Sequence, residues 1–265
     1  MAEPAGVGAA IRAALLTETT RERVMAARRI ARDWRQGRLA FTFVPLPDCP
    51  RRPAAPPLVP ASRLPRRGRG QSPRARIALW HALAHIEFVA IDLALDMAGR
   101  FGAVAGAQFT GDFLAIAAEE AMHFALIDRH LAALGSHYGA LPAHDGLWQA
   151  ALETRHDLAA RLAVVPLVLE ARGLDVTPSM LARARASGDA RGARILQRIL
   201  DDEIRHVATG AKHFLAHCER TRKTPGPEWR MLVTGHFRGS LKPPFNDSAR
   251  QAAGLPREWY AALAS

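Results

Sequence analysis

The chain has 265 residues, of which 49% are apolar and 23% are charged, a balance that excludes a wholly disordered chain. Its two cysteines, Cys49 and Cys218, are too few for a disulfide framework or for a cysteine-rich zinc or iron–sulfur site. The net charge is +11, and residues 1–76 hold 16 basic and 5 acidic side chains, so the whole basic excess lies in the N-terminal third.

The first 72 residues are expected to form an arm ahead of the main domain. Apolar residues recur at helical spacing through residues 8–38, which predicts one or two amphipathic helices within an N-terminal segment, residues 1–43. Residues 44–72 are rich in proline. Because proline at this density excludes regular helix and central strand, we expect an extended connector there.

Residues 73–218 are predicted to hold four long helices. Ser72 suits the N-cap and Pro73 the first position of the first helix, while Thr110 and Gly135 bound the second. No run has the pattern of a strand, so the predicted fold class is all-α. The predicted helix ranges are 73–99, 110–135, 147–172 with an interruption at Gly173–Pro178 and a short helix at 179–186, 190–218, and two shorter helices at 228–238 and 247–253 within a C-terminal extension over residues 219–265.

Each of the four long helices carries a glutamate in apolar surroundings. A carboxylate in the middle of an apolar helix face is expected to be buried, and burying it alone is costly. In the second and fourth helices a histidine follows the glutamate at i+3, so both side chains project from one face. The six candidate ligands are Glu87, Glu120, His123, Glu170, Glu203 and His206.

This set matches the requirement of a dimetal site. A di-iron or di-manganese centre in a four-helix bundle takes one Glu from each of two helices and a Glu-x-x-His pair from each of the other two. The spacing also repeats, because Glu87 and Glu120 are 33 residues apart and so are Glu170 and Glu203. Mixed carboxylate and imidazole ligands suit Fe and Mn. We therefore expect two Fe or Mn ions held by two similar helical hairpins.

Some ligand assignments stay open. Glu119 lies four residues before His123 and is an alternative to Glu120, although the repeat favours Glu120. A third Glu-x-x-His match, Glu153 with His156, has polar neighbours, which favours a solvated or supporting pair. The alternative for the whole set is a metal-free bundle in which these side chains make salt bridges and buried hydrogen bonds, but four buried acids with two histidines would lack compensating charge.

Other polar residues of these helices are expected to play supporting or structural roles. Ligating histidines commonly donate their second ring N–H to a carboxylate, and Asp201 and Asp202 are candidates for accepting it from His123 or His206. The polar residues on a different face of the first helix are His81, His85, Asp92 and Asp96.

Several runs of the sequence resemble a known family. They are HALAHIEFVAIDLALD (81–96), AAEEAMHF (117–124), PAHDGLW (142–148), LEARGLDVTP (169–178) and ILDDEIRHVATG (199–210). They are similar to the bacterial ferritin-like proteins catalogued as domain of unknown function 455, over roughly residues 51–247. The resemblance implies a ferritin-like bundle with a dimetal carboxylate centre and a similarity to the tRNA hydroxylase branch of that superfamily. It implies no substrate.

Three functions follow from this site. The first is an oxidase or hydroxylase that uses O₂ or peroxide on an unknown small molecule, with Tyr138, Trp148 and Phe124 expected to wall its pocket. The second is iron or manganese handling with ferroxidase-like turnover, for which a monomer or homodimer is favoured over a closed shell. The third is an RNA-modifying hydroxylase whose basic N-terminal arm attracts the polyanion. No catalytic residue is assigned.

Two further expectations concern location and chain path. No uninterrupted apolar run reaches the roughly 18–20 residues that span a bilayer, and the N-terminus lacks a basic signal region, so a cytoplasmic protein without membrane attachment is expected. A ferritin-like bundle needs a long crossover between its second and third helices, so part of residues 146–157 is expected to belong to that crossover or the third helix to start later.

Overall fold

The computed structural model describes residues 5–64 and 72–264, and within these ranges the chain is helical and contains no strand. This confirms the predicted all-α class. The chain divides into two compact units, one ending at Trp148 and the other beginning at Gln149. The boundary between them falls inside the segment 73–218 in which four long helices were predicted.

The first unit begins with two amphipathic helices, α1 (Val7–Leu15) and α2 (Thr20–Arg35). Thr19 and Glu22 form a capping box at the start of α2, which satisfies two of its unpaired backbone N–H groups. The apolar face of α2 is buried and packs against α4 (Ala107–Ala133). The predicted N-terminal helices are thus confirmed.

The proline-rich connector is irregular from residue 44 to 64 except for a short 3₁₀ turn, η1 (Ala61–Arg63); its remainder, residues 65–71, lies outside the described residues. Polar contacts fix it to the helices that follow. Arg52 forms ion pairs with Asp92 and Asp145, and the indole N–H of Trp148 donates to the carbonyl of Asp48. An extended segment can therefore be ordered without secondary structure of its own.

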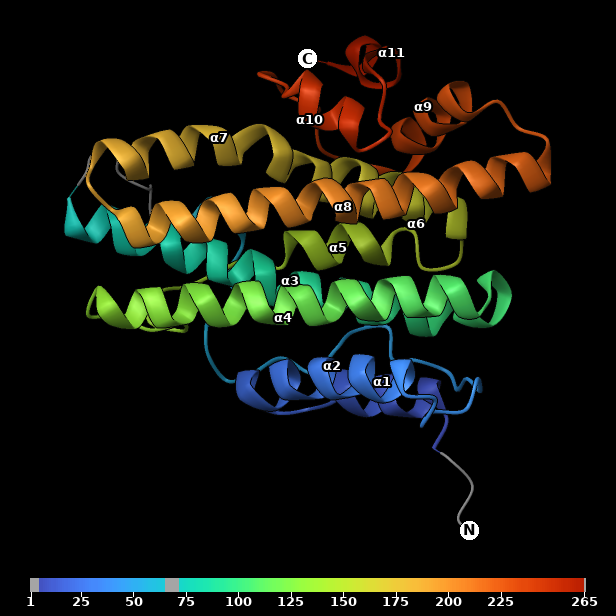
Figure 1. The fold of residues 1–265 in the computed structure, drawn as a ribbon, viewed down its shortest axis with the longest axis horizontal. Coiled ribbons are helices and arrows are strands. Elements are labelled where there is room, and N and C mark those ends of the chain that lie inside the picture. Colours follow the sequence, from blue (N-terminus) through green and yellow to red (C-terminus); the bar gives the residue numbers. More distant parts are fainter. Residues whose placement is uncertain (1–4, 65–71, 265) are drawn as a thin grey trace. The chain divides into compact units, whose positions relative to one another are not determined.

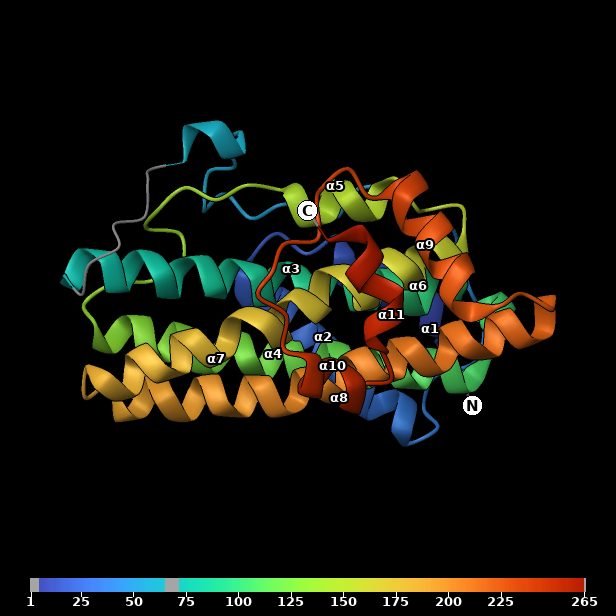
Figure 2. The same ribbon diagram turned by 90° about the horizontal axis from the view of Figure 1, so that it is seen from above.

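The long helices α3 (Pro73–Ala105) and α4 form an antiparallel hairpin around Gly106, whose φ of 99° suits a residue without a side chain (Figure 2). The ring of Trp80 lies 4.4 Å from that of His130. At the other end, a Cβ on Gly102 would lie 2.5 Å from Oγ1 of Thr110. These contacts fix a register that puts residue 87 opposite residue 123.

By length and composition α3 is apolar enough to cross a membrane, but 67% of its most apolar window is buried inside the protein. This burial is what a core helix of a soluble protein shows.

After the short helix α5 (Gly146–Leu152), the second unit contains a helix that changes from α to π geometry and back to α. The helix α5 crosses the unit boundary, and a new helix, α6 (Leu158–Val164), starts after Asp157, which caps it by accepting from the Ala160 N–H. A π-helical segment, η2 (Val165–Glu170), follows and leads into α7 (Ala171–Ala186). The predicted continuous helix over 147–172 is therefore wrong, and the later start of the helix agrees with the expected crossover path.

The predicted interruption at Gly173–Pro178 is also wrong, because α7 continues through Pro178. A proline inside a helix frees the carbonyl four residues earlier, here that of Leu174. The side-chain amide of Asn246 donates to this carbonyl at 3.1 Å. A residue far away in sequence thus supplies the hydrogen bond that the proline removes.

The remaining helices complete the second unit. They are α8 (Ala190–Thr221), α9 (Pro225–His236), α10 (Asp247–Ala252) and α11 (Arg257–Tyr260), followed by the 3₁₀ turn η3 (Ala261–Leu263). α7 and α8 lie side by side (Figures 1 and 2). α9 and α10 match the predicted C-terminal helices, and the buried ion pair of Arg250 with Asp175 ties α10 to α7.

Candidate metal centre

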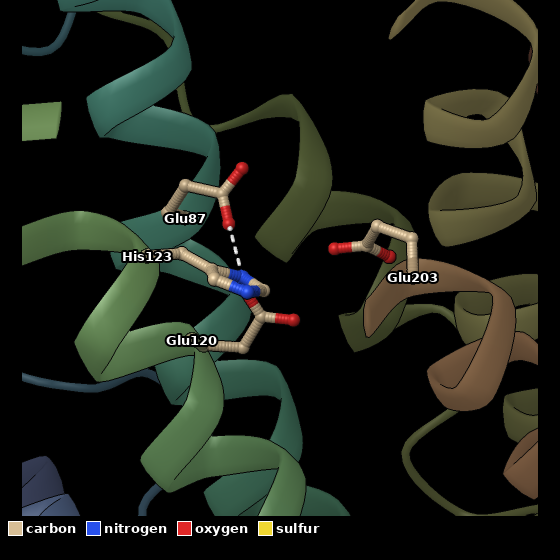
Figure 3. A group of neighbouring side chains, drawn as sticks. All are labelled: Glu87, Glu120, His123 and Glu203. Atoms are coloured by element: carbon tan, nitrogen blue, oxygen red, sulfur yellow. Dashed lines mark hydrogen bonds and ion pairs between the residues drawn. The ribbon is translucent and has the colours of Figure 1, made fainter. Parts of the chain in front are cut away.

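The first unit brings three of the six predicted ligands together. Glu87 projects from α3, and Glu120 and His123 project from one face of α4 (Figure 3). One ligand atom of each lies within 4.8 Å of the other two. Nδ1 of His123 is 3.2 Å from Oε2 of Glu87 and 3.4 Å from Oε2 of Glu120. These three side chains, which we call half-site 1, are at most 5% exposed.

The electrostatics of half-site 1 favour a cation. The pKa of Glu87 lies well above its ordinary value, first because burial disfavours its charged form and second because the Glu120 carboxylate lies nearby. Oε2 of Glu87 is buried and lacks a hydrogen bond of good geometry. A divalent cation would supply the charge that two buried carboxylates need, and both carboxylate and imidazole are ligands that Fe and Mn accept.

The second unit holds the other three predicted ligands, which we call half-site 2. Glu203 and His206 project from one face of α8, with Nδ1 of His206 3.7 Å from Oε1 of Glu203. Both are buried, and Glu170, the last residue of η2, is half-buried. Figure 3 also draws Glu203 on its helix.

Two glycines fix how α8 lies against the helix that carries Glu170. A Cβ on Gly210 would lie 2.3 Å from Cβ of Pro166, so this glycine permits close contact between α8 and η2. A Cβ on Gly173 would lie 3.8 Å from Cγ of Glu203. Gly173 is one turn after Glu170, and these antiparallel contacts put Glu170 opposite His206.

The two hairpins therefore repeat one arrangement. In the first, Glu87 lies beside His123; in the second, Glu170 and His206 occupy the corresponding positions of the register. The equal spacing of 33 residues in the sequence thus corresponds to an equal helical register. Each half-site holds one lone glutamate and one Glu-x-x-His pair.

The π-helical segment that ends at Glu170 was not predicted from the sequence. Such segments are rare and occur often at functional sites. The signal available in hindsight is Pro166, which lacks the N–H that a regular helix needs at that position.

The alternative ligands occupy less suitable environments. Glu119 is half-buried whereas Glu120 is 1% exposed, and Glu120 is the one grouped with His123. Glu153 and His156 are both exposed, as the solvated-pair interpretation requires. Asp202 is buried and forms ion pairs with Arg198 and Arg205.

The other polar face of α3 is used for structure. His85 lies between the hydroxyl of Tyr138, at 2.9 Å, and the carbonyl of His144, at 3.0 Å. Asp92 forms buried ion pairs with Arg23 and Arg52. Neither Arg23 nor its role was visible in the sequence, because an arginine on a basic amphipathic helix is ordinarily solvated.

Of the three residues expected to wall the pocket, Tyr138 and Phe124 do contact each other. The Tyr138 ring packs edge-on to Phe124 and tilted on Phe88, with centroids 5.1 and 5.6 Å apart. Phe124 follows His123 and Phe88 follows Glu87, so this cluster adjoins half-site 1 in the chain. Trp148 instead packs with the connector, under the guanidinium of Arg52.

Comparison with known proteins places the chain in a family. An uncharacterized protein of Haemophilus influenzae is 45% identical over 164 residues, which is 60% of this chain and 57% of that relative. The chain thus matches little more than half the length of this relative. No solved structure matches the chain. The family described as protein of unknown function (DUF455) matches residues 16–261. This match covers both units and both half-sites, and the chain therefore belongs to that family.

Proposed function

We propose that the protein is a dimetal carboxylate oxidase or hydroxylase, in which the two half-sites together hold two Fe or Mn ions. The observation that carries the proposal is the repeat: two hairpins with the same register, each presenting one Glu opposite one Glu-x-x-His pair. A complete dimetal site needs this number and type of ligands. We propose accordingly that α3, α4, the α6–η2–α7 helix and α8 form a ferritin-like four-helix bundle.

The bound ions would supply the capacity to bind and activate O₂ or peroxide. The protein's part is to hold charge and exclude water. Glu87 and Glu120 provide buried negative charge, and His123 provides a ring nitrogen between them. The rings of Phe88, Phe124 and Tyr138 pack on one another. Phe88 and Phe124 follow Glu87 and His123 in the chain, so this cluster contributes to a low-dielectric surrounding, which strengthens electrostatic interactions.

Metal analysis with matched variants tests this proposal. The purified protein is loaded with Fe(II) or Mn(II) without oxygen, and the bound metal is counted before optical spectra are followed on exposure to air. We expect two ions per chain and an oxygen-dependent spectral change. Glu120→Gln should lose metal, whereas Glu153→Gln, which alters the exposed Glu-x-x-His sequence of Glu153 and His156, should not. Retention of fewer than two ions, or equal loss in both variants, contradicts the proposal.

One surface favours an RNA substrate as the second candidate. On α2, Arg21, Arg28, Arg32 and Arg35 are exposed and recur at helical spacing on one side. Arg32 forms an ion pair with Asp33, so the experiment below replaces the other three arginines. A row of arginines suits contact with a phosphate backbone.

Salt-dependent binding of RNA separates the two substrates. We expect an RNA-modifying enzyme to bind RNA with affinity that falls steeply as salt rises. Replacing Arg21, Arg28 and Arg35 by Glu should abolish the binding, whereas replacing the exposed Arg183, Arg191 and Arg194 of the second unit should not. Absence of binding at low salt eliminates this candidate and leaves the dimetal proposal intact.

A further inference from the structure

The first unit contains a cavity that neither half-site uses. Its volume is about 430 Å³, within the range of small-molecule sites. It lies along the N-terminal half of α3 and against residues 141–147. Its walls are mainly apolar, and Ile86, which is 43% exposed, is one of them. Ala78 and Ala82, which are one turn apart on α3, are two other apolar lining residues.

The charge that the described lining residues bring to the cavity is positive. Arg74, in the first turn of α3, is exposed and lines it, and the N-terminus of a helix adds a partial positive charge. The other polar lining residues are Ser72 and three histidines, and none of the lining residues described is acidic. The cavity is therefore complementary to an anion with an apolar body.

Hydrogen bonds fix how two of the histidines face a ligand. Nε2 of His81 accepts from the backbone N–H groups of Gly139 and Leu141, at 3.0 and 3.3 Å, so its ring proton is on Nδ1. Because Nε2 accepts these hydrogen bonds the ring is neutral, and burial lowers its pKa. Both nitrogens of His85 are used, by Tyr138 and His144. Nδ1 of His81 thus carries the proton that this ring can donate.

The spacing of these groups sets the length of the ligand. Arg74 and His81 are seven residues apart on α3, which corresponds to about 10 Å along the axis. Ala78 lies between them and leaves room because its side chain is small. A carboxylate with a chain of about eight carbons has this extended length.

We propose that this cavity binds a medium-chain carboxylic acid, with its carboxylate at Arg74 and its apolar chain along Ala78 and Ala82 toward His81. The site is built by residues of the first unit and needs no metal. It would give the protein a ligand-binding site that is separate from the proposed metal centre.

Titration calorimetry of the full-length protein tests this site. Octanoate is the probe, and 1-octanol and octylammonium are the charge controls. We expect saturable octanoate binding with a stoichiometry of one. Binding of octanol should be about tenfold weaker because it lacks the charge that Arg74 recognises, and octylammonium should not bind.

Two variants with matched controls locate the binding. Ala78→Trp fills the cavity and should abolish octanoate binding, whereas Ala103→Trp, on the exposed side of the same helix, should not change it. Arg74→Gln should weaken binding about tenfold, whereas Arg28→Gln should leave it unchanged. Circular dichroism confirms that each variant is folded.

The result that overturns the proposal is an octanoate affinity that is equal in the wild type and Ala78→Trp, or equal for octanoate and octylammonium. Metal-free protein is used for every titration and metal content is measured separately. The octanoate result can therefore be interpreted even if the dimetal proposal fails, and the metal analysis can be interpreted even if octanoate does not bind.

Discussion

Glu87 and Glu120 bring two buried carboxylates to one ring of His123, and this arrangement costs stability when no cation is bound. Burial and the like charge of Glu120 raise the pKa of Glu87, so the folded state disfavours its ionised form. We predict that Glu87→Gln raises the free energy of unfolding of the metal-free protein by about 1–2 kcal/mol.

Urea denaturation of the metal-free protein measures this gain in stability. The metal content of the loaded protein measures how much metal binding is lost. Glu87→Gln should lose metal while gaining stability, since groups that serve a function are often held at a cost to folding. A variant that is destabilised without metal would assign Glu87 a structural role instead.

Arg23, unlike Glu87, is expected to stabilise the fold, because partner groups compensate its buried charge. It is fully buried on α2, pairs with Asp92, and donates to the carbonyls of Leu15 and Arg51 at 2.9 and 2.8 Å. We predict that Arg23→Met lowers the free energy of unfolding by about 3–5 kcal/mol, since it leaves a buried charge and two carbonyls short of partners.

The control is Arg21→Met on the exposed side of the same helix, where a change within about 0.5 kcal/mol is expected. Urea denaturation of both proteins gives the comparison. Equal effects in the two variants would show that the ion pair contributes nothing.

At the level of elements, the close contact of α8 with η2 depends on Gly210. A methyl group there would lie 2.3 Å from the rigid ring of Pro166, whereas a Cβ on Gly235 of α9 would meet nothing within 4 Å. We predict that Gly210→Ala destabilises the protein by about 1–3 kcal/mol, although alanine is the better helix former.

Gly235→Ala should instead stabilise it by about 0.5–1 kcal/mol through helix propensity alone. Thermal melts followed by circular dichroism show the two signs directly. Stabilisation by both substitutions would mean that η2 moves aside without cost, and that the register of Glu170 against His206 is loosely held.

At the level of the whole molecule, metal binding is expected to add to stability. A ligand that binds only the folded protein contributes about 2.7 kcal/mol at a free concentration 100 times its Kd. We predict that Mn(II) raises the melting temperature of the wild type and of Glu153→Gln, and that a chelator reverses the rise. Glu120→Gln should show no rise; a rise of the same size in that variant would place the ion elsewhere.

The extent to which the sequence anticipated this molecule differs from one feature to the next. The start of α3 after Ser72 was predicted because the signals of a helix cap are local. The π-helical segment and the continuity of α7 through Pro178 were not predicted, since the first is rare and the second depends on Asn246, which is distant in sequence. Likewise, the cavity beside His81 lies between α3 and residues 141–147, and no local pattern predicts that these two segments meet.

The sequence by itself determined the all-α class, the four glutamates on apolar faces and their equal spacing, because helical periodicity and i, i+3 neighbours are local properties of the chain. Only the tertiary structure decided which atoms lie near each other: that Glu87 meets His123, that Arg23 is buried on Asp92, and that two glycines set the register of α8. The physical reason is that burial and contact depend on residues brought together from distant positions, and no local pattern encodes which ones they are.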